Sequence, residues 1–159
     1  MPAFNQGYGL LVDGQLHDEY GVRAGHKPDI SAQLVERICR KITDHAQDLV
    51  DVEEWLLEDA EVAVVAYGSP ARASSRAVKE ARTKGIKAGF LKMRILWPFP
   101  EEVLDKLCTH VKRFIVPEMN MGKMVREVER VAAGRIEVIS LPKIGGEMHT
   151  PANILEAIQ

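Results

Sequence analysis

Cysteine is scarce in this chain, which contains only Cys39 and Cys108 among its 159 residues. An iron–sulfur cluster takes about four cysteine ligands, so these two residues cannot hold one. They also lie far apart in the sequence and form no Cys-x-x-Cys pair, which excludes the usual ligand pattern of a structural zinc site. Each lies on the apolar face of a predicted helix, and we therefore expect two buried, unpaired thiols.

Long hydrophobic runs and an excess of one charge are lacking as well. No stretch approaches the ~18 apolar residues that a membrane-spanning helix needs, and the N-terminus has no signal-peptide core. Lysine and arginine number 21 against 23 aspartates and glutamates, which leaves a formal net charge of -2. Because there is no basic excess, nothing indicates a nucleic-acid partner. We expect a cytoplasmic protein that binds neither membranes nor nucleic acid.

Several catalytic signatures are missing too. The sequence contains no Gly-x-Gly-x-x-Gly, no Walker pattern and no Gly-x-Ser-x-Gly elbow, so neither a tight nucleotide site nor a hydrolase is indicated. The cluster His17-Asp18-Glu19 has the residue types of a metal or acid–base site. However, three successive residues do not share one face of a helix or strand, and a solvated or interface turn is the favoured interpretation.

What the sequence does contain is a regular alternation of strand-like and helix-like segments from Val62 to Met124. Apolar or alternating segments at 62–66, 86–90 and 114–116 are each followed by a turn and by a helical pattern. Such alternation is typical of helices that connect parallel strands. With a last strand expected at 136–141, we predict a three-layer α/β/α sandwich with a mainly parallel sheet of four or five strands.

The first 28 residues have a different character. They are rich in glycine, and only residues 10–12 have the composition of a short strand. We predict a linker or arm from a preceding domain over residues 1–28, and one α/β domain over residues 29–159.

Other elements of the predicted domain follow from local signals. Asp29 or Ser31 is expected to cap the first helix. The acidic segment 51–60 is expected to form a short helix or turn that leads into the first strand of the core. Thr150 and Pro151 are expected to begin a final short helix.

Three turns follow strands of the predicted sheet, which is where ligands or partners usually meet such a domain. In the turn at 68–72, Ser69 and Arg72 are candidates to hold an anion at a helix N-terminus, although this signal is weak. The alternative, which the sequence favours, is that Ser69 is simply the helix N-cap.

The other two turns are candidates for an interface. Trp97, Pro98 and Phe99 form a rigid apolar knob that either anchors a partner or covers its own sheet. Glu118 and Asn120 form a functional polar pair or an intersubunit hydrogen bond, or else Asn120 simply caps the next helix.

These three turns also carry a family resemblance. The motifs GSPAR at 68–72, LWPFP at 96–100 and PEMNMG at 117–122 occur in this order. Together they resemble the alpha subunit of 2-oxoacid:ferredoxin oxidoreductases, and most of all the C-terminal part of the 2-oxoglutarate type, which is related to the C-terminal domain of transketolases. The segment DGQLHDEYG at 13–21 resembles the link from the preceding thiamine-fold domain.

The resemblance implies an enzyme complex that oxidatively decarboxylates a 2-oxoacid with coenzyme A, giving an acyl-CoA, carbon dioxide and reduced ferredoxin. It implies thiamine diphosphate, magnesium and iron–sulfur clusters in the complex. This chain lacks the Gly-Asp-Gly and asparagine signature of magnesium–diphosphate binding, and it lacks cluster cysteines. We therefore expect a piece of a larger subunit that binds none of these cofactors alone and is inactive alone.

The resemblance also implies partners, and it gives this domain an architectural role. The expected partners are the thiamine-fold domain of the same subunit and the beta subunit, with coenzyme A and ferredoxin at the level of an oligomeric complex. Because parallel strands bring the three turns to one edge, we expect this edge to be the interface, with the residues Trp97, Pro98, Phe99, Glu118, Asn120 and Gly122.

Two other functions compete with an assembly domain. One is a stand-alone α/β module that binds an anion such as a coenzyme A phosphate. The other is a self-contained small enzyme, which the lack of a convergent acid–base set disfavours. The sequence does not specify the 2-oxoacid, because substrate contacts are expected outside this chain.

Overall fold

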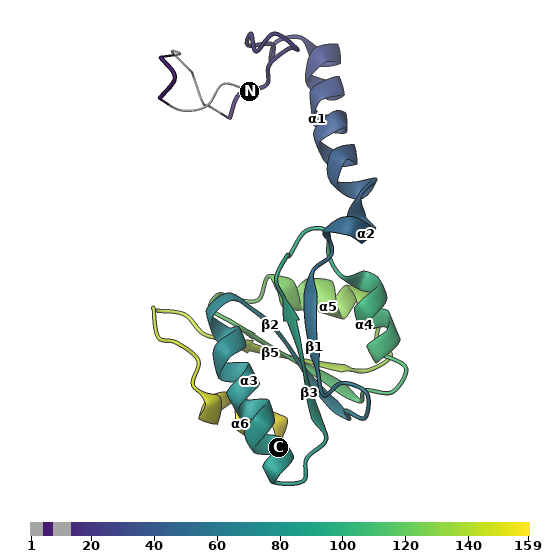
Figure 1. The fold of residues 1–159 in the computed structure, drawn as a ribbon, viewed down its shortest axis with the longest axis vertical. Helices are drawn as coiled ribbons and strands as arrows, with labels where there is room; N and C mark the ends of the chain where they lie inside the picture. The colour runs from purple at the N-terminus through teal and green to yellow at the C-terminus, as the bar shows by residue number, and fades with distance from the viewer. Residues whose placement is uncertain (1–4, 8–13) are drawn as a thin grey trace. The chain divides into compact units, whose positions relative to one another are not determined.

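The computed structural model of the protein describes residues 5–7 and 14–159. The chain forms two units, which divide between His45 and Ala46 (Figure 1). The boundary predicted after residue 28 falls inside the first unit, where helix α1 begins, and the predicted strand at 10–12 lies outside the described residues. None of the described helices has the length and apolar character needed to cross a membrane.

The described part of the first unit contains a small turn and one long helix. Asp18 closes the turn, because its Oδ1 accepts the backbone N–H groups of Tyr20 at 3.0 Å and Val22 at 2.9 Å. Helix α1 (Pro28–Thr43) follows, with Lys27 at its N-cap. The predicted caps were therefore wrong, because Pro28 begins the helix earlier and the hydroxyl of Ser31 instead donates to the carbonyl oxygen of Ala24.

Helix α1 also corrects the prediction for the cysteines. Its one buried residue is Leu34, and Ile38 is half exposed. Cys39 is consequently exposed, whereas Cys108 is partly buried at the end of a helix in the second unit. An apolar stripe at spacing four predicts which face of a helix can be buried, but burial also requires a second element that covers this face.

The second unit begins with the short helix α2 (Ala46–Leu49) and contains a five-stranded sheet in the order β1-β3-β2-β4-β5 (Figure 1). Strands β2, β3, β4 and β5 are parallel, and β1 pairs antiparallel with β3 at one edge. The bounds are β1 (Val52–Trp55), β2 (Val62–Tyr67), β3 (Ala88–Met93), β4 (Arg113–Glu118) and β5 (Glu137–Pro142). The mainly parallel sheet predicted from the sequence is confirmed.

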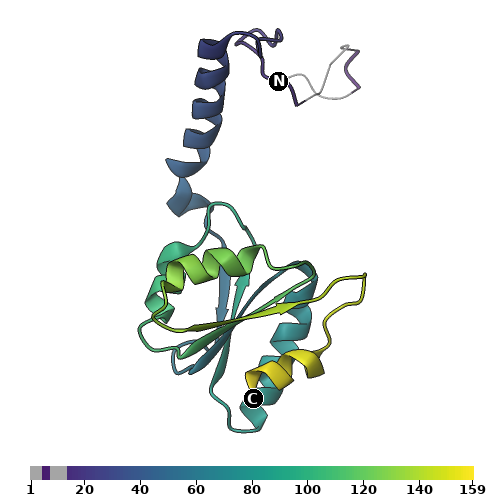
Figure 2. The ribbon, with the colours of Figure 1, turned by 180° about the vertical axis from the view of Figure 1, so that it is seen from behind.

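Four helices complete the three layers. Helices α4 (Glu101–Leu107) and α5 (Met124–Ala132) cover one face of the sheet, and α3 (Gly68–Thr83) and α6 (Pro151–Ile158) cover the other (Figures 1 and 2). Strand β2 is buried on both sides, as its continuous apolar run requires. Helix α6 begins as predicted, with the Thr150 hydroxyl accepting the N–H of Asn153 and Pro151 in the first turn.

Strand β1 was not predicted, since residues 51–60 were expected to form a short helix or turn. Along β1, the partly buried Val52 and Trp55 flank two exposed glutamates. One of them, Glu53, pairs with Lys92 on β3 and with Arg94 just beyond it. Such an acidic edge strand depends on cross-strand partners that are distant in sequence, so local composition did not indicate it.

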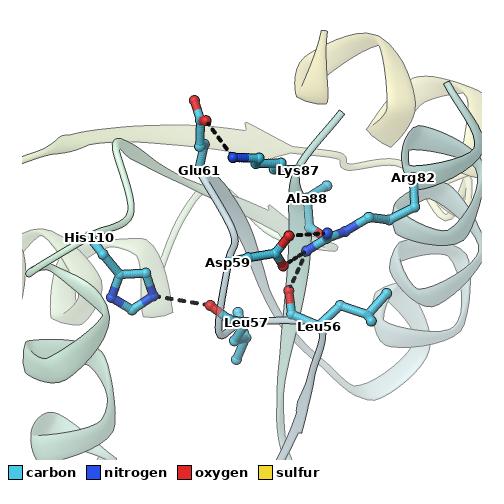
Figure 3. A network of polar contacts seen from close by, with 8 residues as sticks. All are labelled: Leu56, Leu57, Asp59, Glu61, Arg82, Lys87, Ala88 and His110. Carbon is cyan, nitrogen blue, oxygen red and sulfur yellow. Dashed lines mark hydrogen bonds and ion pairs between the residues drawn. The ribbon is translucent and has the colours of Figure 1, made fainter. Parts of the chain in front are cut away.

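Arg82 holds the turn between β1 and β2 against the amino-end side of the sheet (Figure 3). Its guanidinium donates to the carbonyl oxygens of Ala88 at 2.6 Å and Leu56 at 2.7 Å, and it binds both carboxylate oxygens of Asp59. Gly89 allows this close approach, because a Cβ there would lie 2.6 Å from the Leu56 carbonyl oxygen. One side chain thus joins α3, β3 and the turn.

We expect Arg82→Ala to lower the free energy of unfolding by about 1–3 kcal/mol, because it removes charge-assisted hydrogen bonds and leaves carbonyl oxygens without their donor. Arg76→Ala is the matched control on the exposed face of the same helix, with an expected effect within about 0.5 kcal/mol. Urea unfolding followed by circular dichroism measures both. Equal effects of the two substitutions would contradict the role assigned to Arg82.

Candidate functional site

The candidate site lies at the edge of the sheet where the parallel strands end. The loops that follow β3 and β4, and the start of α3 after β2, meet this edge because the three strands are neighbours and parallel. In sheets of this type, ligands and partners are usually bound here. The three motifs that the sequence singled out are therefore at one edge of the sheet, as predicted.

Glu118, the last residue of β4, is the central side chain of this edge. It is only 1% exposed. Its carboxylate accepts three successive backbone N–H groups, from Lys123 at 3.1 Å, Met124 at 3.0 Å and Val125 at 3.0 Å. These are N–H groups at the start of α5, which otherwise have no partner within the helix. The carboxylate of Glu118 thus lies at the N-terminus of α5, in the position where a helix can bind an external anion.

Two further side chains complete the coordination of this carboxylate. The Tyr67 hydroxyl donates to Oε1 at 2.9 Å, and Nδ2 of Asn120 donates to the same oxygen at 3.2 Å and to the Tyr67 hydroxyl at 3.1 Å. Oδ1 of Asn120 accepts the N–H of Gly122 at 2.8 Å, which closes the turn. Asn120 is therefore not the cap of α5, because Glu118 satisfies the N–H groups that a cap would bind.

The surroundings of Glu118 shift the pKa values of both ionisable groups. Burial raises the pKa of Glu118, but the N–H groups of Met124 and Val125, with Tyr67 and Asn120, outweigh it and hold this pKa below its ordinary value of 4.5. Burial, and then the bond to Glu118, raise the pKa of Tyr67 above 10.0. At neutral pH the pair is thus a carboxylate and a protonated phenol, in which the phenol donates.

The backbone of Glu118 binds the loop between β5 and α6. Its carbonyl oxygen accepts the N–H of Lys143 at 2.8 Å and lies 3.1 Å from Nε2 of His149. Because a carbonyl only accepts, the imidazole carries its proton on Nε2. His149 is buried, and its Nδ1 has no partner within residues 5–7 and 14–159.

Tyr67 and His149 were not identified from the sequence. Tyr67 ends the apolar run of β2, so its position at a strand end is the one signal that could have indicated it. His149 lies in a loop, and nothing in its neighbourhood predicts burial.

Ser69 and Arg72, the anion-site candidates, are exposed at the start of α3. The helix begins at Gly68 with Tyr67 as its N-cap, so Ser69 lies inside the first turn and the N-cap interpretation was wrong. Over the described part of the chain, neither side chain has a hydrogen bond or an ion pair. An anion site at this position stays a prediction.

The side chains of the apolar knob differ in burial. Pro98 and Phe99 are buried, and Phe99 belongs to the core on the α4 and α5 side of the sheet. Trp97 is 65% exposed. The knob therefore covers its own sheet with one aromatic ring and presents the other to the surroundings. The interface role of Trp97, Pro98, Phe99, Glu118, Asn120 and Gly122 itself stays a prediction.

The described residues contain no group of three or more histidine, cysteine, aspartate and glutamate side chains that could hold a metal ion. In the cluster His17-Asp18-Glu19, the Asp18 carboxylate is occupied by the backbone of its own turn. The two cysteines of the chain are too few for the about four ligands of an iron–sulfur cluster.

Comparison with known sequences points to one family. Residues 60–154 match the family described as pyruvate:ferredoxin oxidoreductase core domain II. The chain is 44% identical over 158 residues to 2-oxoglutarate synthase subunit KorA of Methanothermobacter marburgensis, a match that covers 99% of this chain and 42% of the relative. The KorA subunit of Methanothermobacter thermautotrophicus is 47% identical over 158 residues, with the same coverage of 99% and 42%. The chain thus spans less than half the length of these relatives.

Two solved structures share the fold. A 2-oxoglutarate:ferredoxin oxidoreductase from Magnetococcus marinus superposes with a TM-score of 0.67 and 24% identity, over 98% of this chain and 28% of that one. A split gene transketolase, described as an inactive beta4 tetramer, gives a TM-score of 0.60 and 22% identity, over 69% of this chain and 40% of that one. At these identities the likeness concerns the fold alone, and it confirms the predicted transketolase-like α/β architecture.

We expect Glu118→Gln to lower the free energy of unfolding by about 2 kcal/mol or more at neutral pH, because an amide nitrogen would face N–H donors. The folded-state pKa of Glu118 lies below its ordinary value of 4.5, so its stabilising effect is present above that pH. The difference between wild type and Glu118→Gln should shrink as the pH falls through the folded-state pKa. Urea unfolding across this pH range measures it, and a constant difference would contradict the assignment.

Tyr67→Phe should have a smaller effect, a loss of about 1 kcal/mol, because it removes one donor of several from Glu118. In the wild type, the Tyr67 phenol should ionise at higher pH than an exposed tyrosine. Spectrophotometric titration at 295 nm in the wild type and in Tyr67→Phe isolates this group. The reference is the tyrosine of a short model peptide, with a pKa of about 10. Ionisation of Tyr67 at the same pH as this reference would contradict the hydrogen bond to Glu118.

Proposed function

The chain belongs to the family of pyruvate:ferredoxin oxidoreductase core domain II, and we propose that it is the assembly domain of the alpha subunit of a 2-oxoacid:ferredoxin oxidoreductase of the 2-oxoglutarate type. The 2-oxoglutarate type is proposed because KorA subunits align with 99% of the chain at 44% and 47% identity. The assembly role is proposed because the chain corresponds to 42% of such a subunit.

The hydrogen bonding of Glu118 is the observation that supports the assembly role. Glu118 is the only buried acidic residue in the described part of the chain. A catalytic acid or base needs a free position for the substrate, but the carboxylate of Glu118 is surrounded by donors from its own domain. In other proteins of this architecture, this edge of the sheet usually holds the active site. In this chain, the buried acid at the same edge instead holds two loops in position.

In this proposal, the whole complex converts a 2-oxoacid, coenzyme A and oxidised ferredoxin into an acyl-CoA, carbon dioxide and reduced ferredoxin. Thiamine diphosphate, magnesium and iron–sulfur clusters would supply the carbanion and electron-transfer chemistry. The described residues present no ligand set for these groups. We therefore assign the cofactors to other parts of the complex and no chemical step to this chain.

The proposed partners are the thiamine-fold domain of the same subunit and the beta subunit. Of the six interface residues predicted from the sequence, Trp97 is the one with a largely exposed side chain. Pro98 and Phe99 anchor it in the core, and Glu118, Asn120 and Gly122 shape the neighbouring turn. We propose that Trp97 contacts the partner and that the other five position the loops.

The experiment that tests this function is expression of the full-length alpha and beta subunits with and without residues 46–159. The complete complex should reduce ferredoxin with 2-oxoglutarate and coenzyme A, and the truncated complex should fail to assemble. Assembly and activity of the truncated complex would refute the assembly role. The alternative, a stand-alone module that binds an anion or coenzyme A, predicts that calorimetry with the isolated chain detects coenzyme A and that Arg72→Ala abolishes the signal.

We predict that Trp97→Ala lowers assembly or turnover of the complete complex but changes the unfolding free energy of the isolated chain by less than about 0.5 kcal/mol. Val64→Ala, in the buried centre of β2, is the control and should cost about 1–3 kcal/mol in the isolated chain. Glu118→Ala does not separate docking from folding, because Glu118 is buried. If Trp97→Ala destabilises the isolated chain as much as Val64→Ala and leaves the complex intact, Trp97 is ordinary core.

A further inference from the structure

The exposed apolar side chains of residues 46–159 are concentrated at one edge of the sheet. Five large apolar residues in this unit are 36–74% exposed, and every one lies in a loop that follows a parallel strand. Two follow β3, one follows β4 and two follow β5. We call this set the apolar edge; its members are Ile95, Trp97, Met121, Ile144 and Met148.

The opposite edge has the reverse character. There Asp59 pairs with Arg82, and Glu61 pairs with Lys87 and Lys112 (Figure 3 shows Glu61 with Lys87). Charged groups in solvent-exposed pairs are compatible with a surface that stays in water. A folded domain has no internal reason to collect its exposed apolar side chains at one edge, and such gatherings mark interaction sites.

Two of the three loops that present the apolar edge, those after β4 and β5, are held by the bonds of the candidate site. The side chain of Glu118 and the amide of Asn120 fix the turn that carries Met121. The carbonyl oxygen of Glu118 holds Lys143 and His149, which bracket the loop with Ile144 and Met148. The apolar side chains are thus presented on constrained backbone, which reduces the entropy lost on binding.

The charges near the apolar edge indicate the chemistry of the partner. Arg94 is neutralised by Asp51 and Glu53, and Lys143 by Glu147. Arg72 and Lys123 are exposed, and neither has an acidic partner within residues 5–7 and 14–159. A complementary surface would therefore be apolar at its centre, with carboxylates at its rim. A second copy of this chain would instead bring the same cations to the contact.

The path of the chain favours a partner in the same polypeptide. Asp51, at which the chain enters the sheet, accepts the backbone N–H groups of Arg94 and Ile95 with its carbonyl oxygen. Val52, the first residue of β1, pairs with Met93, the last residue of β3. Any region joined through residues 1–50 is thus tethered at the apolar edge, at high effective concentration. The relatives have more than half of their length outside this match.

We infer that the apolar edge docks onto an apolar, acid-rimmed protein surface formed by the part of the alpha subunit that lies outside this chain. The inference rests on the proposed function and deepens it, because it names the surface and the chemistry of its partner. It adds Ile95, Met121, Ile144 and Met148 to Trp97 as contact residues.

Methionine oxidation tests the inference directly. Hydrogen peroxide transfers one oxygen atom to an exposed thioether, forming a sulfoxide and water, and mass spectrometry locates the product. In the isolated chain, Met121 and Met148 should react quickly, and Met93, which is 2% exposed, should not. In the full-length subunit, both should be slowed by about tenfold or more, as expected for buried interface residues. Equal rates in the two proteins would overturn the inference.

A charge-insertion pair provides the second test. Met148→Lys places a cation in the apolar edge, and Thr83→Lys places one at an exposed position of α3 beside the opposite edge. Both variants of the isolated chain should unfold like the wild type. In the complete complex, only Met148→Lys should reduce the assembled fraction measured by size-exclusion chromatography, and wild-type assembly of that variant would overturn the inference.

The outcomes separate the inference from the proposed function. If the complex assembles but does not oxidise 2-oxoglutarate, the proposed reaction is wrong, while protection of Met121 and Met148 still supports the docking surface. If the complex is active but both methionines react freely, the proposed function stands and the docking surface is wrong. If the isolated chain forms dimers in which these methionines are protected, the occupant is a second copy and the inference is wrong.

Discussion

The buried carboxylate of Glu118 is the interaction on which the carboxyl-end edge of this protein depends. A charge removed from water is costly unless it is fully hydrogen-bonded. Here the backbone of α5, the phenol of Tyr67 and the amide of Asn120 provide those bonds. The direction of α5, the end of β2 and the turn between β4 and α5 are therefore coupled through one side chain. Its carbonyl oxygen extends the coupling to the loop after β5.

This arrangement explains how the domain can be rigid at the edge where related architectures bind ligands. A helix N-terminus at the end of a parallel strand attracts an anion. In this chain the anion is a glutamate of the preceding strand. The start of α5 is therefore saturated from within, while Met121, Ile144 and Met148 are exposed on the loops after β4 and β5. The bonds of Glu118 hold these two loops.

The two ends of the sheet differ in the kind of side chain that they expose. At the amino-end side, Arg82 joins a turn, a strand and a helix, and the neighbouring charges are paired with one another. At the carboxyl-end side, the polar side chains of Glu118 and His149 are buried, and five large apolar side chains are exposed. The proposed assembly role requires one surface that tolerates water and another that is stabilised when it is buried.

The sequence by itself determined the layered architecture, because period and composition are local properties. The continuous apolar run of β2, the small residues of α3 and the Thr150-Pro151 start of α6 each indicated their element without distant contacts. The three motifs were also predicted to share one edge of the sheet, as they do, and through resemblance they indicated the family. Only the tertiary structure decided which residues that are far apart in the chain contact one another. The edge strand β1 needs β3 beside it, Cys39 is exposed although its sequence neighbourhood predicted a buried thiol, and Tyr67 reaches Glu118 across 51 positions of sequence. Burial and hydrogen bonding of this kind depend on which segments meet in space, and local periodicity does not contain that information.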